Sequence, residues 1–218
     1  MSCCSPAAYG TVFDEREARR NARTYRKRGL DPTARRLVSF LKAQEEVPRT
    51  VLEIGGGIGA LQMELLRAGA SRATNIELSP AYEAVAQDLL ADAGLTDRVQ
   101  RHLGDFAAAP DAFPPADVVI MHRVVCCYPE AARLVSAAAS HAQRYLAMSY
   151  PRNAWWVRMG LAAENLLLFS MRGIGFRTYV HPPQTILATA QGYGLTPAFQ
   201  HRGWLWETVV LRRGGGSR

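Results

Sequence analysis

The chain has 218 residues, 48% of them hydrophobic, and carries a formal net charge of +7 at pH 7. This length and composition predict one globular domain with a sizeable core and exclude a disordered chain. No apolar run is long enough to cross a bilayer, and the N-terminus lacks the basic-then-apolar pattern of a signal peptide, so we expect a cytoplasmic protein without a membrane span.

The first 34 residues are predicted to form a helical segment that acts as a lid, with residues 1–10 either unstructured or ordered only as a flap. A charged helix is expected over 14–27. Asp31 and Pro32 are typical of the start of a second helix, as its N-cap and its first helical residue. Much of the positive charge lies in this segment, where it indicates a solvated helix face more than a nucleic-acid site.

Residues 35–212 are predicted to form one α/β domain, a Rossmann-like, doubly wound and mostly parallel sheet with a C-terminal antiparallel hairpin. Strand-like and helix-like segments alternate along it: strands at 50–54, 73–78, 98–103, 117–121 and 144–149, helices at 58–68, 80–93, 130–142 and 184–193, and a hairpin at 195–201 and 204–211. The segment 153–181 interrupts this alternation and is predicted to be an inserted substrate cap. Residues 213–218 read as a flexible tail.

One glycine-rich stretch is especially informative. Residues 51–59 read VLEIGGGIG, a buried strand that runs into Gly55, Gly57 and Gly59 ahead of a helix. Glycines let the backbone turn sharply and approach a ligand closely, and the next helix presents free N–H groups. The spacing alone would also suit a dinucleotide. Glu53 would repel a pyrophosphate but can hold a cation, which favours S-adenosylmethionine (SAM) over NAD.

Two further acids close the next two strands. Glu77 is expected to accept hydrogen bonds from both ribose hydroxyls, with Leu78 beside it. Asp105 is expected to bind the adenine amino group, while Phe106 packs on the ring. Because the carboxyl ends of neighbouring parallel strands share one edge, these acids and the glycine loop together form a specific signal for a SAM site.

On these motifs the chain resembles the class I SAM-dependent methyltransferases over roughly residues 35–212. Within that superfamily, the stretches 123–129 and 149–152 are similar to magnesium-protoporphyrin O-methyltransferases, in which a basic N-terminal helix pair also precedes the core. The resemblance implies SAM as methyl donor, S-adenosylhomocysteine as product and a small-molecule acceptor.

The loop after strand 117–121 is expected to face the methyl group. His122 is the candidate base and lies beside the cofactor, unless it only bonds a neighbouring strand. Arg123 either binds an acidic substrate or, the slightly favoured alternative, pairs with an acid on a nearby helix. The porphyrin enzymes have a histidine before a Tyr-Pro pair, whereas here Cys127 precedes Tyr128, so these two residues are further catalytic candidates and the substrate and base stay open.

The four cysteines form two adjacent pairs, Cys3-Cys4 and Cys126-Cys127, which a cytoplasmic chain keeps reduced. They lack the spacing of a zinc knuckle, so no metal is predicted. Cys126 and Cys127 are interpreted first as small core residues. The alternative is that the N-terminal pair folds over them and completes a pocket for a soft substrate or metal.

Tyr25 of the first helix, with Trp155 and Asn165 of the inserted helix, are the remaining candidates for substrate contact. The sequence therefore predicts a SAM-dependent methyltransferase that acts on a small, partly apolar organic acceptor at oxygen, as a monomer or homodimer. One alternative is a thiol or metalloid methyltransferase that uses the cysteine pairs. Another is a non-catalytic SAM-binding partner protein.

Overall fold

The structure is a computed structural model that describes residues 6–172 and 176–214. Its N-terminal part contains three helices, α1 (Pro6–Val12), α2 (Glu15–Arg28) and α3 (Pro32–Lys42). The side chain of Asp31 caps α3 by accepting a hydrogen bond from the Thr33 N–H at 2.9 Å, as the sequence predicted. Residues 6–10 are helical, so the unstructured alternative predicted for 1–10 is wrong for this part; the rest of that range lies outside the described residues.

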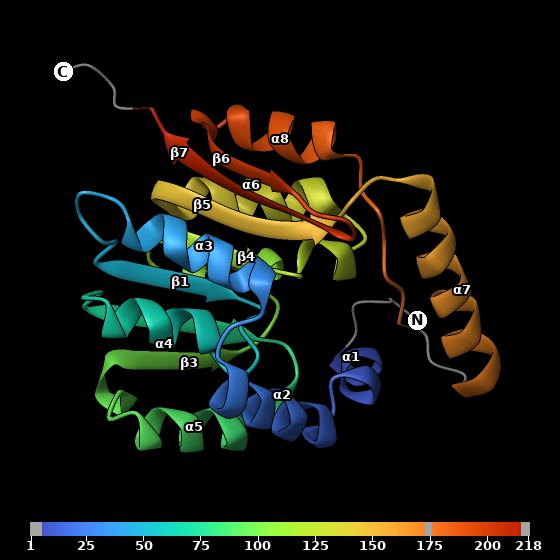
Figure 1. Ribbon diagram of the computed structural model, residues 1–218, viewed down its shortest axis with the longest axis horizontal. Coiled ribbons are helices and arrows are strands. Elements are labelled where there is room, and N and C mark those ends of the chain that lie inside the picture. Colours follow the sequence, from blue (N-terminus) through green and yellow to red (C-terminus); the bar gives the residue numbers. More distant parts are fainter. Residues whose placement is uncertain (1–5, 173–175, 215–218) are drawn as a thin grey trace.

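The core is a seven-stranded sheet with the order β3-β2-β1-β4-β5-β7-β6 (Figure 1). Its strands are β1 (Thr50–Ile54), β2 (Arg72–Glu77), β3 (Val99–Leu103), β4 (Ala116–His122), β5 (Ala142–Pro151), β6 (Leu195–Arg202) and β7 (Trp206–Arg213). The first five strands are parallel, and β7 pairs antiparallel with both β5 and β6. This confirms the predicted fold class.

Helices cover both faces of the sheet, because alternate residues of each strand point to opposite sides. Along β4, Val118 and Ile120 belong to the hydrophobic core on one face, whereas Val119 and Met121 belong to the core on the other. The first face is covered by α3, α4 (Ala60–Arg67) and α5 (Glu83–Asp92), and the second by α6 (Ala131–His141) and α8 (Pro183–Gln191). Five short 3-10 turns complete the loops, at Pro80–Tyr82, Thr96–Arg98, Phe106–Ala108, Pro110–Ala112 and Val125–Cys127.

Most elements agree with the predicted bounds to within two residues, and two of the differences have a clear cause. β5 continues to Pro151, two residues beyond the expected end, because the antiparallel partner β7 extends the pairing as far as Trp206. The predicted helix over 80–93 begins as a 3-10 turn before α5.

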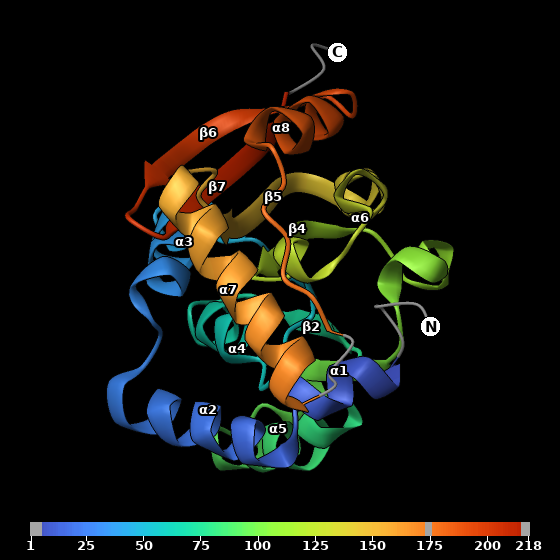
Figure 2. The same ribbon diagram turned by 90° about the vertical axis from the view of Figure 1, so that its right-hand side faces the viewer.

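The helix α7 (Trp155–Arg172) stands beyond the carboxyl ends of the strands, apart from both helical layers (Figures 1 and 2). An irregular segment over 176–182 returns the chain from it to α8. None of the described helices, α7 included, combines the length and apolarity that a membrane span requires.

Candidate cofactor and acceptor site

A cavity of about 470 Å³ lies along the carboxyl ends of β1, β2 and β4. Its lining includes most of the residues that the sequence singled out, namely Glu53, Gly55, Gly57, Glu77, Leu78, Asp105, Phe106, His122, Arg123, Cys127, Tyr128 and Tyr25. Four other candidates, Gly59, Cys126, Trp155 and Asn165, do not line it. The cavity is therefore the candidate functional site.

The glycine loop owes its shape to backbone conformations that other residues rarely adopt. Gly55, Gly57 and Gly59 have φ angles of 61°, 53° and 78°. A Cβ on Gly59 would also come within 2.4 Å of the side chain of Gln62. Gly59 is thus a structural glycine at the N-terminus of α4, while Gly55 and Gly57 face the cavity.

Glu53 is a carboxyl group buried below this loop, with 2% of its surface exposed. One of its oxygens accepts a hydrogen bond from the Gln62 N–H at 3.1 Å. Burial raises the pKa of Glu53 to about 8, and the Gln62 N–H and the charge of Arg101 offset only part of that effect. The group is therefore mostly protonated at neutral pH, and a cation bound beside it would favour its ionised form.

Glu77 closes β2 and is fixed by three backbone donors. Its Oε1 accepts hydrogen bonds from the N–H groups of Leu78 and Ser79, at 2.8 and 2.9 Å. Its Oε2 accepts one from the N–H of Gly57 at 2.8 Å. A carboxylate has about four acceptor positions, so one remains that could accept a hydrogen bond from a ligand hydroxyl.

The third acid lies beside an aromatic wall. Asp105 accepts a hydrogen bond from the Tyr128 hydroxyl at 3.2 Å and one from the Ala107 N–H at 2.9 Å. Phe106 is 2% exposed, and its ring packs against Phe113 with the ring centres 5.9 Å apart. This end of the cavity combines an acceptor with flat apolar surface, which suits an adenine ring.

His122 is held from both sides. Its Nδ1 lies 2.9 Å from Ser149 Oγ, and its Nε2 lies 3.0 Å from Asp31 Oδ2. Since Ser149 Oγ also accepts the Arg123 N–H, its hydroxyl hydrogen is free to point at His122 Nδ1. The ring nitrogen Nε2 then carries a proton and donates a hydrogen bond to Asp31.

Asp31 is the acid that Arg123 contacts, at 3.2 Å from its guanidinium. Burial alone would raise the pKa of Asp31, but the hydrogen bond from His122 and the charges of His122 and Arg123 together lower it well below the ordinary value. The guanidinium also lies over the Trp206 ring, 4.7 Å from its centre. Of the two alternatives for Arg123, the structure shows the pairing with an acid of a nearby helix. That acid is Asp31, the N-cap of α3.

The vicinal cysteines sit where the loop turns back toward the sheet. Their sulfur atoms are 3.8 Å apart, and both lie within hydrogen-bond distance of the Arg123 carbonyl. Cys126 is buried, whereas Cys127 reaches the cavity. The hydrogen bond with Cys126, together with burial, raises the pKa of the Cys127 thiol well above its usual value. Cys3 and Cys4 lie outside the described residues.

The N-terminal helices supply cavity residues that the sequence did not single out. Tyr9 and Phe13 pack on Phe176 and form an aromatic wall, and the Tyr9 hydroxyl donates to the Cys127 carbonyl at 2.5 Å. Tyr25 lines the cavity, but its hydroxyl donates to Glu64 at 2.7 Å. Burial and this bond raise the Tyr25 pKa.

Two candidates of the inserted helix lie elsewhere. Trp155 is 70% exposed. The amide of Asn165 is used within the chain, because it donates to the Thr178 carbonyl at 2.8 Å and accepts the Thr178 N–H at 2.9 Å. Asn165 thereby ties α7 to the segment after it.

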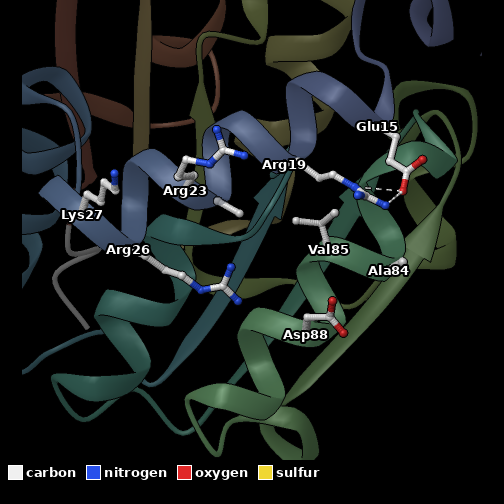
Figure 3. Close-up of a pocket in the computed structure, with 9 residues that line it drawn as sticks. Glu15, Arg19, Arg23, Arg26, Lys27, Ala84, Val85 and Asp88 are labelled. Atoms are coloured by element: carbon white, nitrogen blue, oxygen red, sulfur yellow. Dashed lines mark hydrogen bonds and ion pairs between the residues drawn. The ribbon is translucent and has the colours of Figure 1, made fainter.

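A second hollow of about 530 Å³ lies on the opposite side of α2, between α2 and α5 (Figure 3). Figure 3 shows Arg19, Arg23, Arg26 and Lys27 along one wall and Asp88 on the other, with Arg19 paired to Glu15. Four basic side chains face two carboxylates, those of Glu15 and Asp88, so it is a predominantly basic groove on the surface.

Comparisons with known proteins agree with this geometry. Residues 51–147 match a family described as a methyltransferase domain. An arginine N(omega)-methyltransferase from Streptomyces achromogenes subsp. streptozoticus is 31% identical over 115 residues, which cover 50% of this chain. The chain spans about a third of that relative, since the alignment covers 32% of it.

Solved structures have the same fold. Magnesium protoporphyrin IX methyltransferase from Synechocystis PCC 6803, with bound S-adenosylhomocysteine, superposes with a TM-score of 0.68 at 22% identity, over 84% of this chain and 82% of that one. An O-methyltransferase family 2 protein from Planctomyces limnophilus DSM 3776, in complex with apigenin, has a TM-score of 0.65 at 20% identity, over 92% of this chain and 62% of that one.

The strand order, the glycine loop with its three acids and the methyltransferase-domain match over residues 51–147 agree with the predicted class I SAM-dependent methyltransferase. Within this class, the chain is similar in fold to magnesium protoporphyrin IX methyltransferase. The residues present fit SAM, because a buried carboxyl such as Glu53 is suited to a cationic ligand group.

Proposed function

We propose that this protein transfers a methyl group from SAM to an oxygen atom of a small, partly apolar organic acceptor. The observation that carries the proposal is the make-up of the 470 Å³ cavity. Three acids line one part of it. Aromatic and apolar residues from α1 and the loop after β4 line another, where Arg123 and His122 add polar groups.

In the proposed cofactor site, each of the three acids binds a different part of SAM. Glu53 would hold the cationic methionine portion, Glu77 the ribose and Asp105 the adenine, with Phe106 on the ring. Gly55 and Gly57 would allow the backbone to approach this ligand closely. When bound, SAM supplies a methyl group already activated by its sulfonium, so the chain has to position the acceptor and exclude water.

His122 has a conditional role in this proposal. With the ring proton on Nε2 donated to Asp31, the basic lone pair lies on Nδ1, so His122 can take a proton from an acceptor only if the Ser149 hydroxyl turns away from Nδ1. An acceptor that arrives ionised, such as a carboxylate, would need no base and could pair with Arg123. His122 and Arg123 would then act mainly by positioning the acceptor oxygen.

The apolar part of the acceptor is proposed to rest on Tyr9, Phe13 and Leu78, which form one cluster with Phe176 and Cys127. The segment 1–34 would act as the lid and 153–181 as the cap. The solved relative that binds apigenin supports an aromatic acceptor, and the arginine methyltransferase supports a nitrogen acceptor instead.

One observation favours a second candidate, a thiol or metalloid acceptor. The Cys126 and Cys127 sulfur atoms lie 3.8 Å apart at the cavity wall. Two thiolates can chelate a soft ion. However, the described residues include no group of three or more His, Cys, Asp or Glu side chains that could hold a metal ion.

The test is methyl transfer from isotope-labelled SAM to four acceptor panels: phenols, aromatic carboxylic acids, guanidines and trivalent arsenicals. We expect label on oxygen, lost in Glu77→Ala and retained within a few-fold in Cys127→Ala. Label on guanidine nitrogen with none on any oxygen acceptor would refute the oxygen assignment. Transfer only to arsenicals, abolished by Cys127→Ala, would replace it with the second candidate.

A further inference from the structure

The outer surface of α7 is unusually apolar. Trp155, Met159, Leu166, Leu167 and Phe169 are 57–70% exposed on this one helix. The turn between β6 and β7 adds Trp204 and Leu205, which are 71% and 43% exposed. The Arg152 N–H donates to the Leu205 carbonyl at 2.8 Å, so this turn lies close to the start of α7. We call these seven side chains the α7 patch.

The spacing on α7 is that of a helix that packs on another helix. Trp155, Met159, Ala162, Leu166 and Phe169 follow one another at intervals of four, three, four and three residues and are all exposed. This alternation places them on a single stripe, as in the seam between two packed helices. Only Arg158 and Glu164 are charged among residues 155–170.

The opposite side of α7 is already packed against the protein. Val157 is buried, and Leu168 contacts the aromatic cluster of Tyr9 and Phe176. The exposed stripe is therefore a second apolar surface in addition to the one that holds the helix. A helix that is apolar on both sides is expected between two partners rather than at a water-facing surface.

The size of the patch matches an interface. Trp155, Phe169 and Trp204 leave 63–71% of their surface exposed. At 150–250 Å² each, they offer about 300–500 Å². The four aliphatic side chains raise this exposed area toward the roughly 800 Å² that each partner buries in a standard interface. A patch of that area is larger than the apolar patches that monomers usually expose.

From these observations we infer that the α7 patch is the contact surface of a homodimer, in which α7 packs against the same helix of a second copy. Aromatic residues, Met and Arg are enriched at such interfaces, while Lys and Asp are depleted, and the patch with Arg158 on its rim has this composition. Symmetric dimers bring the same surface of both subunits together, so the self-complementary helix stripe needs no other partner.

A bilayer is the main alternative occupant, and the charges do not favour it. A helix that lies on an anionic membrane usually carries several Lys or Arg beside its apolar face. Along 155–170, Arg158 is balanced by Glu164. The basic residues instead gather on α2, where Arg19, Arg23, Arg26 and Lys27 line the groove against α5 (Figure 3).

The position of the patch links it to the site. α7 stands beyond the carboxyl ends of the strands (Figures 1 and 2), and its inner residue Leu168 contacts the cluster that includes Tyr9 and Cys127. A partner on the outer face would therefore hold the wall of the cavity in place.

Sedimentation equilibrium of the full chain at micromolar concentration tests the inference. We expect twice the chain mass of 24.0 kDa for the wild type and a single chain mass for Met159→Glu/Leu166→Glu. Tyr193→Glu, a matched change at a residue 39% exposed and outside the patch, should remain dimeric. Circular dichroism and SAM affinity should show that all three proteins are folded.

If the double variant loses its fold, Leu166→Gln replaces it, with a dissociation constant for the dimer raised at least tenfold as the expected result. A wild type that stays monomeric up to 100 µM overturns the inference. So does a wild type that is monomeric in solution but sediments with phosphatidylglycerol-containing vesicles, which would assign the patch to a membrane. A double variant that remains dimeric and folded would also overturn it, by placing the interface elsewhere.

Discussion

The buried carboxyl of Glu53 makes SAM binding depend on pH in a defined direction. Its pKa is raised to about 8 without a ligand, so at pH 7 about nine molecules in ten carry the proton. A cation bound beside Glu53 favours the carboxylate, so binding should release close to one proton. Between pH 6 and 8 we therefore expect the SAM dissociation constant to fall by roughly 50-fold, and to level off above pH 8.

Glu53→Gln provides the matched perturbation, because Gln has nearly the shape of the protonated acid but cannot ionise. Its affinity for SAM should vary little over this range, so the gap between wild type and variant should widen by roughly 50-fold from pH 6 to pH 8. Calorimetry at pH 7 in two buffers of different ionisation enthalpy measures the released proton directly. A wild-type affinity that is constant from pH 6 to 8, without proton release, would refute the reasoning.

The same shift affects stability in the absence of SAM. The pKa of Glu53 is higher in the folded protein than the ordinary 4.5, so the folded state binds the proton more tightly than the unfolded state does. The contribution of Glu53 to stability is then largest below pH 4.5, and this contribution is lost as the pH rises through 8. From pH 5 to 9 the loss should be about 4 kcal/mol at most, and Glu53→Gln should remove it.

Three further changes test the other parts of the site. Glu77→Ala should weaken SAM binding by about 2–3 kcal/mol in calorimetry without unfolding the chain; an unchanged affinity would mean that Glu77 does not hold the ribose. Cys126→Ala/Cys127→Ala should cost about 1–3 kcal/mol in denaturant unfolding and leave SAM affinity and oxygen methylation within a few-fold, whereas abolished turnover would support the soft-acceptor alternative. Asp31→Asn keeps a good helix cap but loses its charge beside His122 and Arg123, so at pH 7 it should cost about 1 kcal/mol. Because the pKa of Asp31 is lowered in the folded protein, this cost should begin to shrink below about pH 4 and disappear only as the pH falls through the lowered folded pKa. A cost that is independent of pH would contradict the ion-pair account.

The sheet and the line of acids could be predicted because their signals are local in sequence. Each acid closes or follows its own strand, and parallel pairing brings Glu53, Glu77 and Asp105 to one edge. The order β3-β2-β1-β4 then places these strand ends side by side. Nothing beyond strand pattern and the geometry of parallel sheets was needed.

Of the contacts around His122, the bond to a neighbouring strand was among the alternatives that the sequence offered, but the ion pair with Asp31 was not. Its partner Asp31 is 91 residues away in the sequence and was recognisable only as a helix cap, whereas Ser149 lies opposite His122 on the neighbouring strand β5. The outward position of Trp155 was equally hidden, because α7 is apolar on both sides and its pattern does not reveal which side packs. A long-range pairing of polar side chains leaves no periodic signal in a single sequence.

Asp31 connects the predicted lid with the chemistry of the site. It caps α3 through backbone N–H groups and at the same time binds both His122 and Arg123, which line the cavity. Any movement of the junction between α2 and α3 must therefore either carry these two side chains with it or break their contacts. Opening would free the His122 Nε2–H and the Arg123 guanidinium together, and these are two donors that an acceptor with an ionised oxygen could use. In the closed arrangement His122 Nε2 and Arg123 Nη2 are both directed at Asp31, so an acceptor that binds these two groups would have to take the place of the Asp31 carboxylate.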